Sequence, residues 1–179
     1  MRVDLKVFES DAFWKQFSLQ CKLAIEGTKL ILNFDIFGPL ETLLVHSQAQ
    51  IPKFRDNLWK ETCFELFCAR PNENSYREFN LSPSGDWAVY DFRSYRVVAN
   101  PKVEGTPQSI VLGHEVRQCA CKVELGSDLL PAGCASWQDL EFGIAAVLEL
   151  RNGQISHWAP SHPKPVADFH YRANFKFKI

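Results

Sequence analysis

The sequence has no excess of charge of either sign. Its 20 Lys and Arg residues nearly balance 21 Asp and Glu residues, which leaves a formal net charge of −1 over 179 residues. A protein that binds nucleic acid neutralises many phosphates, so it needs an excess of cationic residues or at least a cationic block. This sequence has neither feature, and it therefore predicts no nucleic-acid partner.

Long apolar segments are also missing from the sequence. No run approaches the roughly 18 apolar residues of a membrane-spanning helix, so we expect no membrane partner. Residues 1–6 alternate charged and apolar side chains and lack the apolar stretch of a signal peptide. These two absences together lead us to expect a cytoplasmic protein.

Cysteine pairs with metal-binding spacing are absent as well. Cys119 and Cys121 lie two positions apart, which differs from the C-x2-C spacing of a zinc site, and no second pair of this kind follows. We therefore predict no metal site. Because the cytosol is reducing, all six cysteines are expected to be free thiols: Cys21, Cys63, Cys68, Cys119, Cys121 and Cys134.

Helical patterns are scarce, and short alternating segments bounded by Gly, Pro, Asn and Asp fill most of the chain. The 14 Phe, 5 Trp and 4 Tyr residues exclude a disordered chain. No linker or repeat divides the sequence, so we expect one domain over residues 1–179, an all-β sandwich or barrel. The expected strands are 18–26, 29–37, 42–46, 63–69, 76–81, 87–92, 109–114, 119–125, 142–150, 155–160 and 175–179. Single helical turns are expected within 11–17 and 136–140, where Ser136 is a suitable N-cap.

Two neighbouring strands of this set, 63–69 and 76–81, place polar and charged side chains among aromatic ones. Because side chains alternate along a strand, Glu65 lies on one face of the first strand, and Glu78 and Asn80 share one face of the second. The simplest antiparallel register gives three cross-strand pairs: Cys63 with Ser82, Glu65 with Asn80, and Phe67 with Glu78. The two carboxylates and the amide are then close enough to act together on a ligand.

This polar face has two interpretations. It is either the solvated outer surface of a sandwich or a polar pocket with aromatic walls that hydrogen-bonds a small ligand. Sugars suit such a pocket, because their hydroxyls need paired donors and acceptors while their C–H faces stack on aromatic rings. Trp59 and Trp87 lie at the ends of these strands, where loops often build binding sites. The alternative for each tryptophan is a place in the core.

A second cluster lies near the C-terminus, where three of the five histidines fall close to Asp168. They are His157, His162 and His170. Histidines beside an acid can bind a metal or haem, or hold a base for catalysis. The structural alternative is that each ring stabilises a loop by hydrogen-bonding a backbone group.

Three motifs in these segments resemble those of the DOMON-like family. They are Trp-x-x-Thr-Cys-Phe-Glu-x-Phe from Trp59, Glu-Phe-Asn-x-Ser-Pro-Ser-Gly-x-Trp from Glu78, and Trp-x-x-x-His-Pro from Trp158, followed by Asp-Phe-His from Asp168. That family is related to the family 9 carbohydrate-binding modules and to the haem- or sugar-binding DOMON domains. The resemblance implies an immunoglobulin-like or jelly-roll-like β-sandwich of about ten antiparallel strands. It also implies ligand binding without catalysis.

In the carbohydrate-binding relatives, aromatic side chains clamp a sugar end and polar groups bind its hydroxyls. The positions that match these roles here are Trp59, Glu65, Glu78, Asn80, Trp87, Trp158 and His162. We therefore predict a module that binds a carbohydrate or another small polar ligand. A protein-interaction module that docks a partner through a sheet edge or an aromatic face is an alternative.

Haem binding is the second alternative, and the sequence disfavours it. Haem-binding relatives use Met and His as axial ligands, whereas the only methionine here is Met1. We therefore predict no cofactor. A haem held by histidine alone would have to use one of five residues: His46, His114, His157, His162 and His170.

Motifs of catalysis are absent, including a nucleophile elbow, a phosphate-binding glycine loop and H-E-x-x-H. Cys63 near Glu65, or a histidine near Asp168, could form a nucleophile–base pair. Glu65 and Glu78 could also act as the two carboxylates of a glycosidase. Acidic pairs of this kind are common on sheet faces, so we predict that the protein is not an enzyme.

Overall fold

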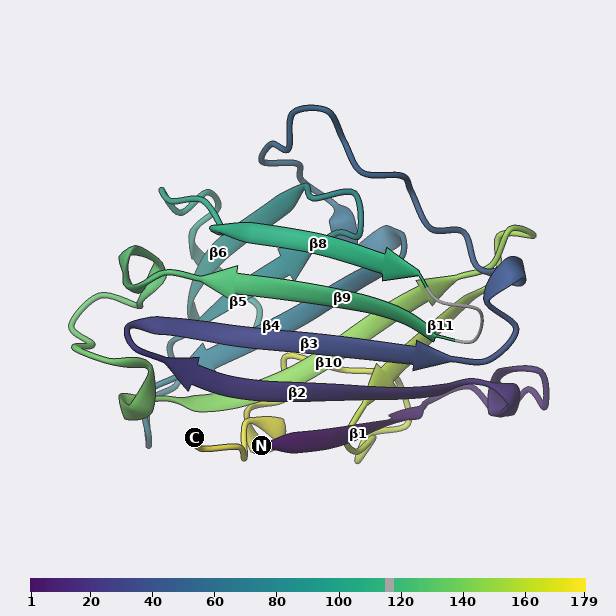
Figure 1. Cartoon of the computed structure of the whole chain (residues 1–179). Helices are drawn as coiled ribbons and strands as arrows, with labels where there is room; N and C mark the ends of the chain where they lie inside the picture. Colours follow the sequence, from purple (N-terminus) through teal and green to yellow (C-terminus); the bar gives the residue numbers. More distant parts are fainter. Residues whose placement is uncertain (115–117) are drawn as a thin grey trace.

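The computed structural model describes residues 1–114 and 118–179, which form eleven antiparallel strands arranged in two layers (Figure 1). The front layer in Figure 1 consists of β1 (Arg2–Val7), β2 (Ser18–Glu26), β3 (Lys29–Phe37), β9 (Gln118–Leu125) and β8 (Ser109–His114). The back layer consists of β7 (Val97–Asn100), β6 (Trp87–Ser94), β5 (Tyr76–Leu81), β4 (Cys63–Ala69), β10 (Glu141–Glu149) and β11 (Ile155–Ala159). The all-β sandwich predicted from the sequence is confirmed.

The helices of the described chain are single 3-10 turns. They are η1 (Trp14–Gln16), η2 (Leu40–Thr42), η3 (Leu58–Lys60), η4 (Ser127–Leu129), η5 (Trp137–Asp139) and η6 (Arg172–Asn174). The Ser136 hydroxyl accepts a hydrogen bond from the Gln138 backbone N–H at the start of η5, so the predicted N-cap is confirmed. Among the described residues, no helix has the length and apolar character needed to cross a membrane.

Strand β1 joins the two layers. Arg2 to Leu5 pair with β2 in the front layer, whereas Lys6 and Val7 pair with β11 in the back layer. Hydrogen bonding therefore continues from one layer to the other through a single short strand. This link joins β11, the last strand of the back layer, to the front layer.

The core fills the space between the layers. The rings of Phe34 in β3 and Phe64 in β4 stack across it with centroids 4.6 Å apart, and both side chains are fully buried. Alternate residues of each strand point into this core, as the period of two requires. The remaining residues of β4 and β5 point to the outer face of the back layer, where a second apolar cluster forms around Phe67 and Tyr76.

Most of the predicted strands agree with the structure. The bounds of β2, β3, β4, β5 and β8 are the predicted ones. Two predicted strands, 42–46 and 175–179, are wrong, because each makes one isolated bridge, Leu43 with Leu150 and Phe177 with Phe142. The Thr42 hydroxyl donates to the Pro39 carbonyl and closes a 3-10 turn where the extended segment was expected. Strands β1 and β7 were not predicted.

All six cysteines are free thiols, as the sequence predicts. Five are buried and Cys134 is half-buried. Burial raises the pKa of the Cys119 thiol to about 11 and raises that of Cys63 well above its ordinary value. A buried thiol with a raised pKa is an inert core residue rather than a nucleophile.

Gly143 in β10 allows the C-terminal segment to lie directly on the back layer. A Cβ atom at this position would meet the Phe175 ring at 2.6 Å. Phe175 in turn contacts the rings of Phe67 and Tyr76, with centroids 5.4 and 5.5 Å away. The absence of a side chain at Gly143 therefore positions the segment that covers the outer face.

Gly143→Ala is expected to destabilise the protein by about 1–3 kcal/mol, because the added methyl group overpacks a buried contact with Phe175. Urea unfolding followed by circular dichroism measures the change. Gly113→Ala in β8 is the matched control, because a Cβ atom at this position would lie 3.9 Å from the Ala120 carbonyl oxygen. This substitution should be neutral or slightly stabilising. Equal stability of the two variants would contradict this role for Gly143.

Candidate functional site

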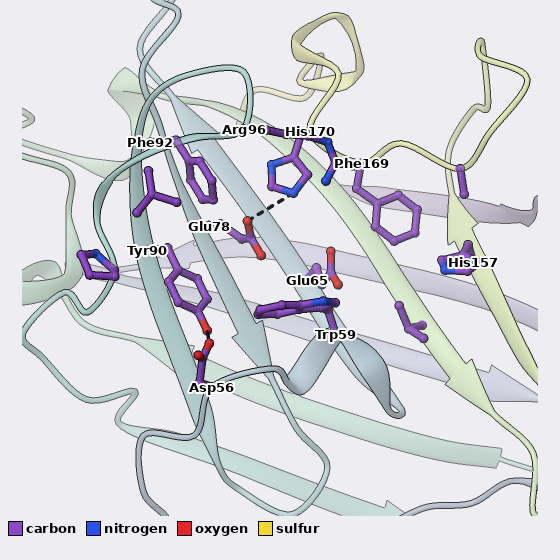
Figure 2. A pocket seen from close by; sticks show the side chains of 14 residues that line it. Asp56, Trp59, Glu65, Glu78, Tyr90, Phe92, Arg96, His157, Phe169 and His170 are labelled. Atoms are coloured by element: carbon purple, nitrogen blue, oxygen red, sulfur yellow. Dashed lines mark hydrogen bonds and ion pairs between the residues drawn. The ribbon is translucent and has the colours of Figure 1, made fainter. Parts of the chain in front are cut away.

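A cavity of about 490 Å³ opens on the outer face of the back layer (Figure 2). Its floor is formed by side chains of β4, β5 and β6, among them Glu65, Glu78 and Tyr90. Trp59 on η3 lies at one side, and Phe169 and His170 of the C-terminal segment lie at the other. The cavity therefore exists only where two distant parts of the chain meet.

The register of the floor matches the prediction. Glu65 pairs with Asn80 and Phe67 pairs with Glu78 in the ladder between β4 and β5. The third predicted pair, Cys63 with Ser82, lies beyond the last recorded pair of this ladder, Phe64 with Leu81. The Cys63 thiol lies 3.6 Å from the Asn80 amide oxygen, which shows that these two side chains share the outer face.

The floor carries two buried carboxyl groups. Glu65 is 3% exposed and Glu78 is 4% exposed. The Asn80 amide N–H donates to Glu78 Oε1 at 2.6 Å, whereas Glu78 Oε2 is buried and has no hydrogen-bond partner among the described residues. A buried polar oxygen without a partner is costly to the fold, so this oxygen needs a hydrogen-bonding partner from another source.

Burial controls the protonation of both carboxyl groups. It raises the pKa of Glu78 to about 7, although the hydrogen bond from Asn80 lowers it. Burial, followed by the charge of Glu78, raises the pKa of Glu65 well above the ordinary 4.5. Two neighbouring carboxylates in a low-dielectric site cannot both ionise easily. At neutral pH the empty pair therefore retains at least part of its protons.

His170 is held in the neutral form. The Tyr76 hydroxyl lies 2.7 Å from His170 Nδ1 and also accepts the Arg96 backbone N–H. Because the Tyr76 oxygen already accepts this N–H, we assign Tyr76 as the donor to Nδ1, and this tautomer places the His170 proton on Nε2, 3.6 Å from Glu78 Oε2. Burial, together with the charge of Arg96, lowers the pKa of His170 to about 4.

Aromatic side chains form the walls. Trp59 is 39% exposed, and its ring makes an edge contact with Tyr90, with centroids 6.1 Å apart. Leu58, its neighbour on η3, is fully buried and anchors the turn, which begins at Asn57 in the left-handed conformation (φ 65°). The Tyr90 hydroxyl donates to Asp56 at 2.6 Å. The Trp59 ring is anchored through its neighbour Leu58 and is partly exposed, so it can stack on a ligand.

Ion pairs fasten the C-terminal segment at the rim of the cavity. Asp168 is paired with Arg96 at 3.3 Å and with Lys164, and it accepts the Tyr95 hydroxyl at 2.9 Å. The His157 ring contacts Phe169, with centroids 5.9 Å apart, and its Nδ1 lies 2.7 Å from Glu9 Oε1. These contacts hold the lining residues Phe169 and His170 over the strands.

The structure brings together some of the predicted site residues and separates others. Trp59, Glu65 and Glu78 line the cavity, and Asn80 supports Glu78 from within the floor. Trp158 is 2% exposed in the core and donates its indole N–H to the Ser156 hydroxyl, 2.7 Å away. The structure therefore places Trp158 in the core and not at the cavity, which corrects its predicted role in ligand binding.

Trp87 and His162 also lie away from the cavity. Trp87 packs against the core between the layers, because it shares the inner face of β6 with Val89. His162 Nε2 lies 2.7 Å from the Lys6 carbonyl, and its ring contacts Phe8 at 5.3 Å, so this histidine stabilises a loop. Trp87 is therefore better described as a core residue, and His162 as a residue that stabilises a loop, than as ligand-binding residues.

Several lining residues were not predicted. They are Asp56, Tyr90, Phe92, Arg96, Val98, Pro101, Val147, Ala167 and Phe169, and two histidines of the C-terminal cluster, His157 and His170. Alternation along 87–92 places Tyr90 and Phe92 on one face, and that pattern alone could have indicated them. The others come from loops or from distant strands. The side chain of His114, a candidate for haem binding, lies outside the described residues.

Comparisons with known proteins support the fold. No protein-family model and no curated protein sequence matches the chain. A solved structure of a proposed carbohydrate-binding protein from Bacteroides uniformis is similar, with a TM-score of 0.65 over 98% of this chain and 84% of that chain. The two sequences are 12% identical, so the similarity concerns the fold alone.

Proposed function

We propose that this protein is a non-catalytic ligand-binding module of the DOMON-like type and that its ligand is a carbohydrate. The main observation is Glu78 Oε2, a buried oxygen without a described partner that lines an open cavity. A ligand hydroxyl in the cavity can both donate and accept, so it would supply the missing partner. The fold similarity to a proposed carbohydrate-binding protein agrees with this proposal.

The shape and lining of the cavity suit a sugar. Its volume of about 490 Å³ lies within the range of small-molecule sites, which is about 300–1,000 Å³. Trp59 offers a ring for the C–H face of the sugar, while Glu65 and Glu78 accept hydrogen bonds from its hydroxyls. A sugar needs both kinds of contact at once, and here both line one cavity (Figure 2).

The chemistry of the floor favours binding over catalysis. Burial raises the pKa of Cys63, so its thiol is not a nucleophile. His170 is neutral, and its Nδ1 accepts the Tyr76 proton, which leaves no free lone pair on the ring to act as a base. Cys63 and His170 are thus better suited to donate or accept a fixed hydrogen bond than to transfer a proton.

Trp59→Ala is expected to weaken the binding of a monosaccharide such as glucose about tenfold, because the ligand loses its stacking surface. Isothermal titration calorimetry measures the affinity. The melting temperature should change little, since Trp59 is partly exposed and Leu58 anchors the turn.

Ile51→Ala is the matched control for Trp59→Ala. Ile51 is a large apolar side chain that is 81% exposed on the loop before η3, so its removal should leave sugar affinity unchanged. If Trp59→Ala binds sugar as tightly as the control, Trp59 is not part of the site. Unfolding of Trp59→Ala would show that the ring is a structural residue.

A further inference from the structure

The charges that line the cavity do not balance. Three carboxyl groups, Asp56, Glu65 and Glu78, face one guanidinium, that of Arg96. Asp56 already accepts the Tyr90 hydroxyl, and Arg96 is already paired with Asp168. Burial raises the pKa of both buried glutamates and the charge of Arg96 lowers it, but among the described residues no Lys or Arg forms an ion pair with either of them. The nearest basic group, His170 Nε2, is neutral and lies 3.6 Å from Glu78.

The two glutamates can contact one ligand atom together. Glu65 pairs with Asn80, and Glu78 is two residues from Asn80 on the same face, so the glutamates are diagonal neighbours. The Cα atoms of such neighbours are about 7–8 Å apart and the Cβ atoms are closer. Two carboxyl groups that extend from these positions into one cavity can approach the same group from either side.

A neutral hydroxyl does not satisfy this pair fully. It supplies one donor and no charge, so the carboxyl groups must stay protonated in the low-dielectric floor. An ammonium group supplies three donors and a positive charge that allows both carboxylates to ionise. The rings of Trp59, Tyr90 and Phe92 line the same cavity and can attract a cation through their faces.

A metal ion is the less suitable cation. No group of three or more His, Cys, Asp or Glu side chains in the described part of the chain could hold a metal ion. The aromatic walls also contribute no metal ligands, whereas they pack well against the apolar body of an organic amine. The lining thus favours an organic cation.

We infer that the ligand carries a protonated amine that binds beside Glu65 and Glu78, so that the sugar is an amino sugar. The sugar part of this inference rests on the proposed function. The amine part does not, because it is argued from the two buried glutamates. The ammonium donates to Glu78 Oε2 and to Glu65, while Trp59 stacks on the ring. An acetylated amine lacks the charge and is a poorer ligand.

The inference also predicts how binding depends on pH. Burial keeps protons on Glu78 and Glu65, and a cation that binds beside them displaces these protons into solvent. The other charged or titratable groups that line the cavity are Asp56, Tyr90, Arg96, His157 and His170. Affinity for an amine that stays protonated is therefore expected to rise as pH increases through about 7.

The test compares three sugars that share a ring and differ at one substituent: glucosamine, glucose and N-acetylglucosamine. Calorimetric titration at about pH 7 should show that glucosamine binds about tenfold more tightly than the other two. In the double variant Glu65→Gln, Glu78→Gln this preference should disappear. Glu26→Gln, an exposed acid at the hairpin between β2 and β3, is the control and should retain it.

A second pair of probes separates the amine from the sugar. Cyclohexylammonium should bind to the wild-type protein, with an affinity that rises from about pH 5 to pH 8, whereas cyclohexanol should bind at least about tenfold more weakly. These comparisons use the wild-type protein, so they hold even if the double variant does not fold.

The outcomes distinguish the inference from the proposed function. Equal affinities for the three sugars would overturn the inference and leave the proposed function in place. Binding of cyclohexylammonium without binding of any sugar would overturn the proposed function and the amino sugar with it, and would support only the amine site beside Glu65 and Glu78. If none of the five probes binds, both are wrong. A preference for glucosamine that the double variant retains would exclude Glu65 and Glu78 as its cause.

Discussion

Glu78→Gln is expected to stabilise the folded protein by about 3 kcal/mol at about pH 8 and by almost nothing at about pH 4.5. Burial raises the pKa of Glu78 from the ordinary 4.5 to about 7. Between these values the unfolded chain has lost the proton and the folded chain keeps it, so the stability of the wild type falls as pH rises. Glutamine retains the acceptor for Asn80 but does not ionise.

Urea unfolding of both proteins at several pH values measures this effect as a difference in the free energy of unfolding. His170 acts in the opposite direction, because its pKa is lowered from 6.5 to about 4 and its contribution is lost as pH falls. The histidine is present in both proteins, so its contribution cancels in the difference. A difference that does not change with pH would show that Glu78 ionises normally in the folded state.

This prediction bears on function as well as on stability. A carboxyl group that destabilises the fold at neutral pH has no structural reason to occupy the floor of the cavity. Replacing such groups commonly stabilises a protein at the cost of activity. We therefore expect Glu78→Gln to be the more stable protein at neutral pH and the weaker binder of glucosamine.

Phe64→Ala is expected to destabilise the protein by about 3–5 kcal/mol, because it leaves a cavity between the two layers. Phe64 is fully buried and stacks on Phe34 of the front layer, with ring centroids 4.6 Å apart. Among the described strands, ladder hydrogen bonds pass from one layer to the other only through the short β1, so side-chain packing of this kind helps to hold the layers together. The loss is large relative to the total stability of a small domain.

The midpoint of urea unfolding measures the loss for Phe64→Ala. Phe8→Ala is the matched control, since Phe8 is a half-buried ring beside His162 at the edge of the fold. It should cost about 1 kcal/mol, as expected for partial burial. A loss at Phe64 no larger than at Phe8 would contradict the role of the stacked pair.

The sequence alone was sufficient to predict much of the fold. Alternation and turn residues define β2, β3, β4 and β5 to the residue, because both are local properties of the chain. They also predict the pairing of Glu65 with Asn80, since a short loop between two strands leaves few registers open. Three of the seven predicted site residues line the cavity, and for two of them, Glu65 and Glu78, alternation and register are the reason.

The tertiary structure decided the rest of the site. Trp87 and Trp158 point into the core, and only the packing of the two layers shows which face of each strand is the inner one. Phe169 and His170 reach the cavity because Gly143 lets Phe175 lie on β10 and because Asp168 pairs with Arg96. These contacts join residues far apart in sequence. Local patterns fix which residues of a strand share a face, but only the folded chain determines what covers that face and what remains open to a ligand.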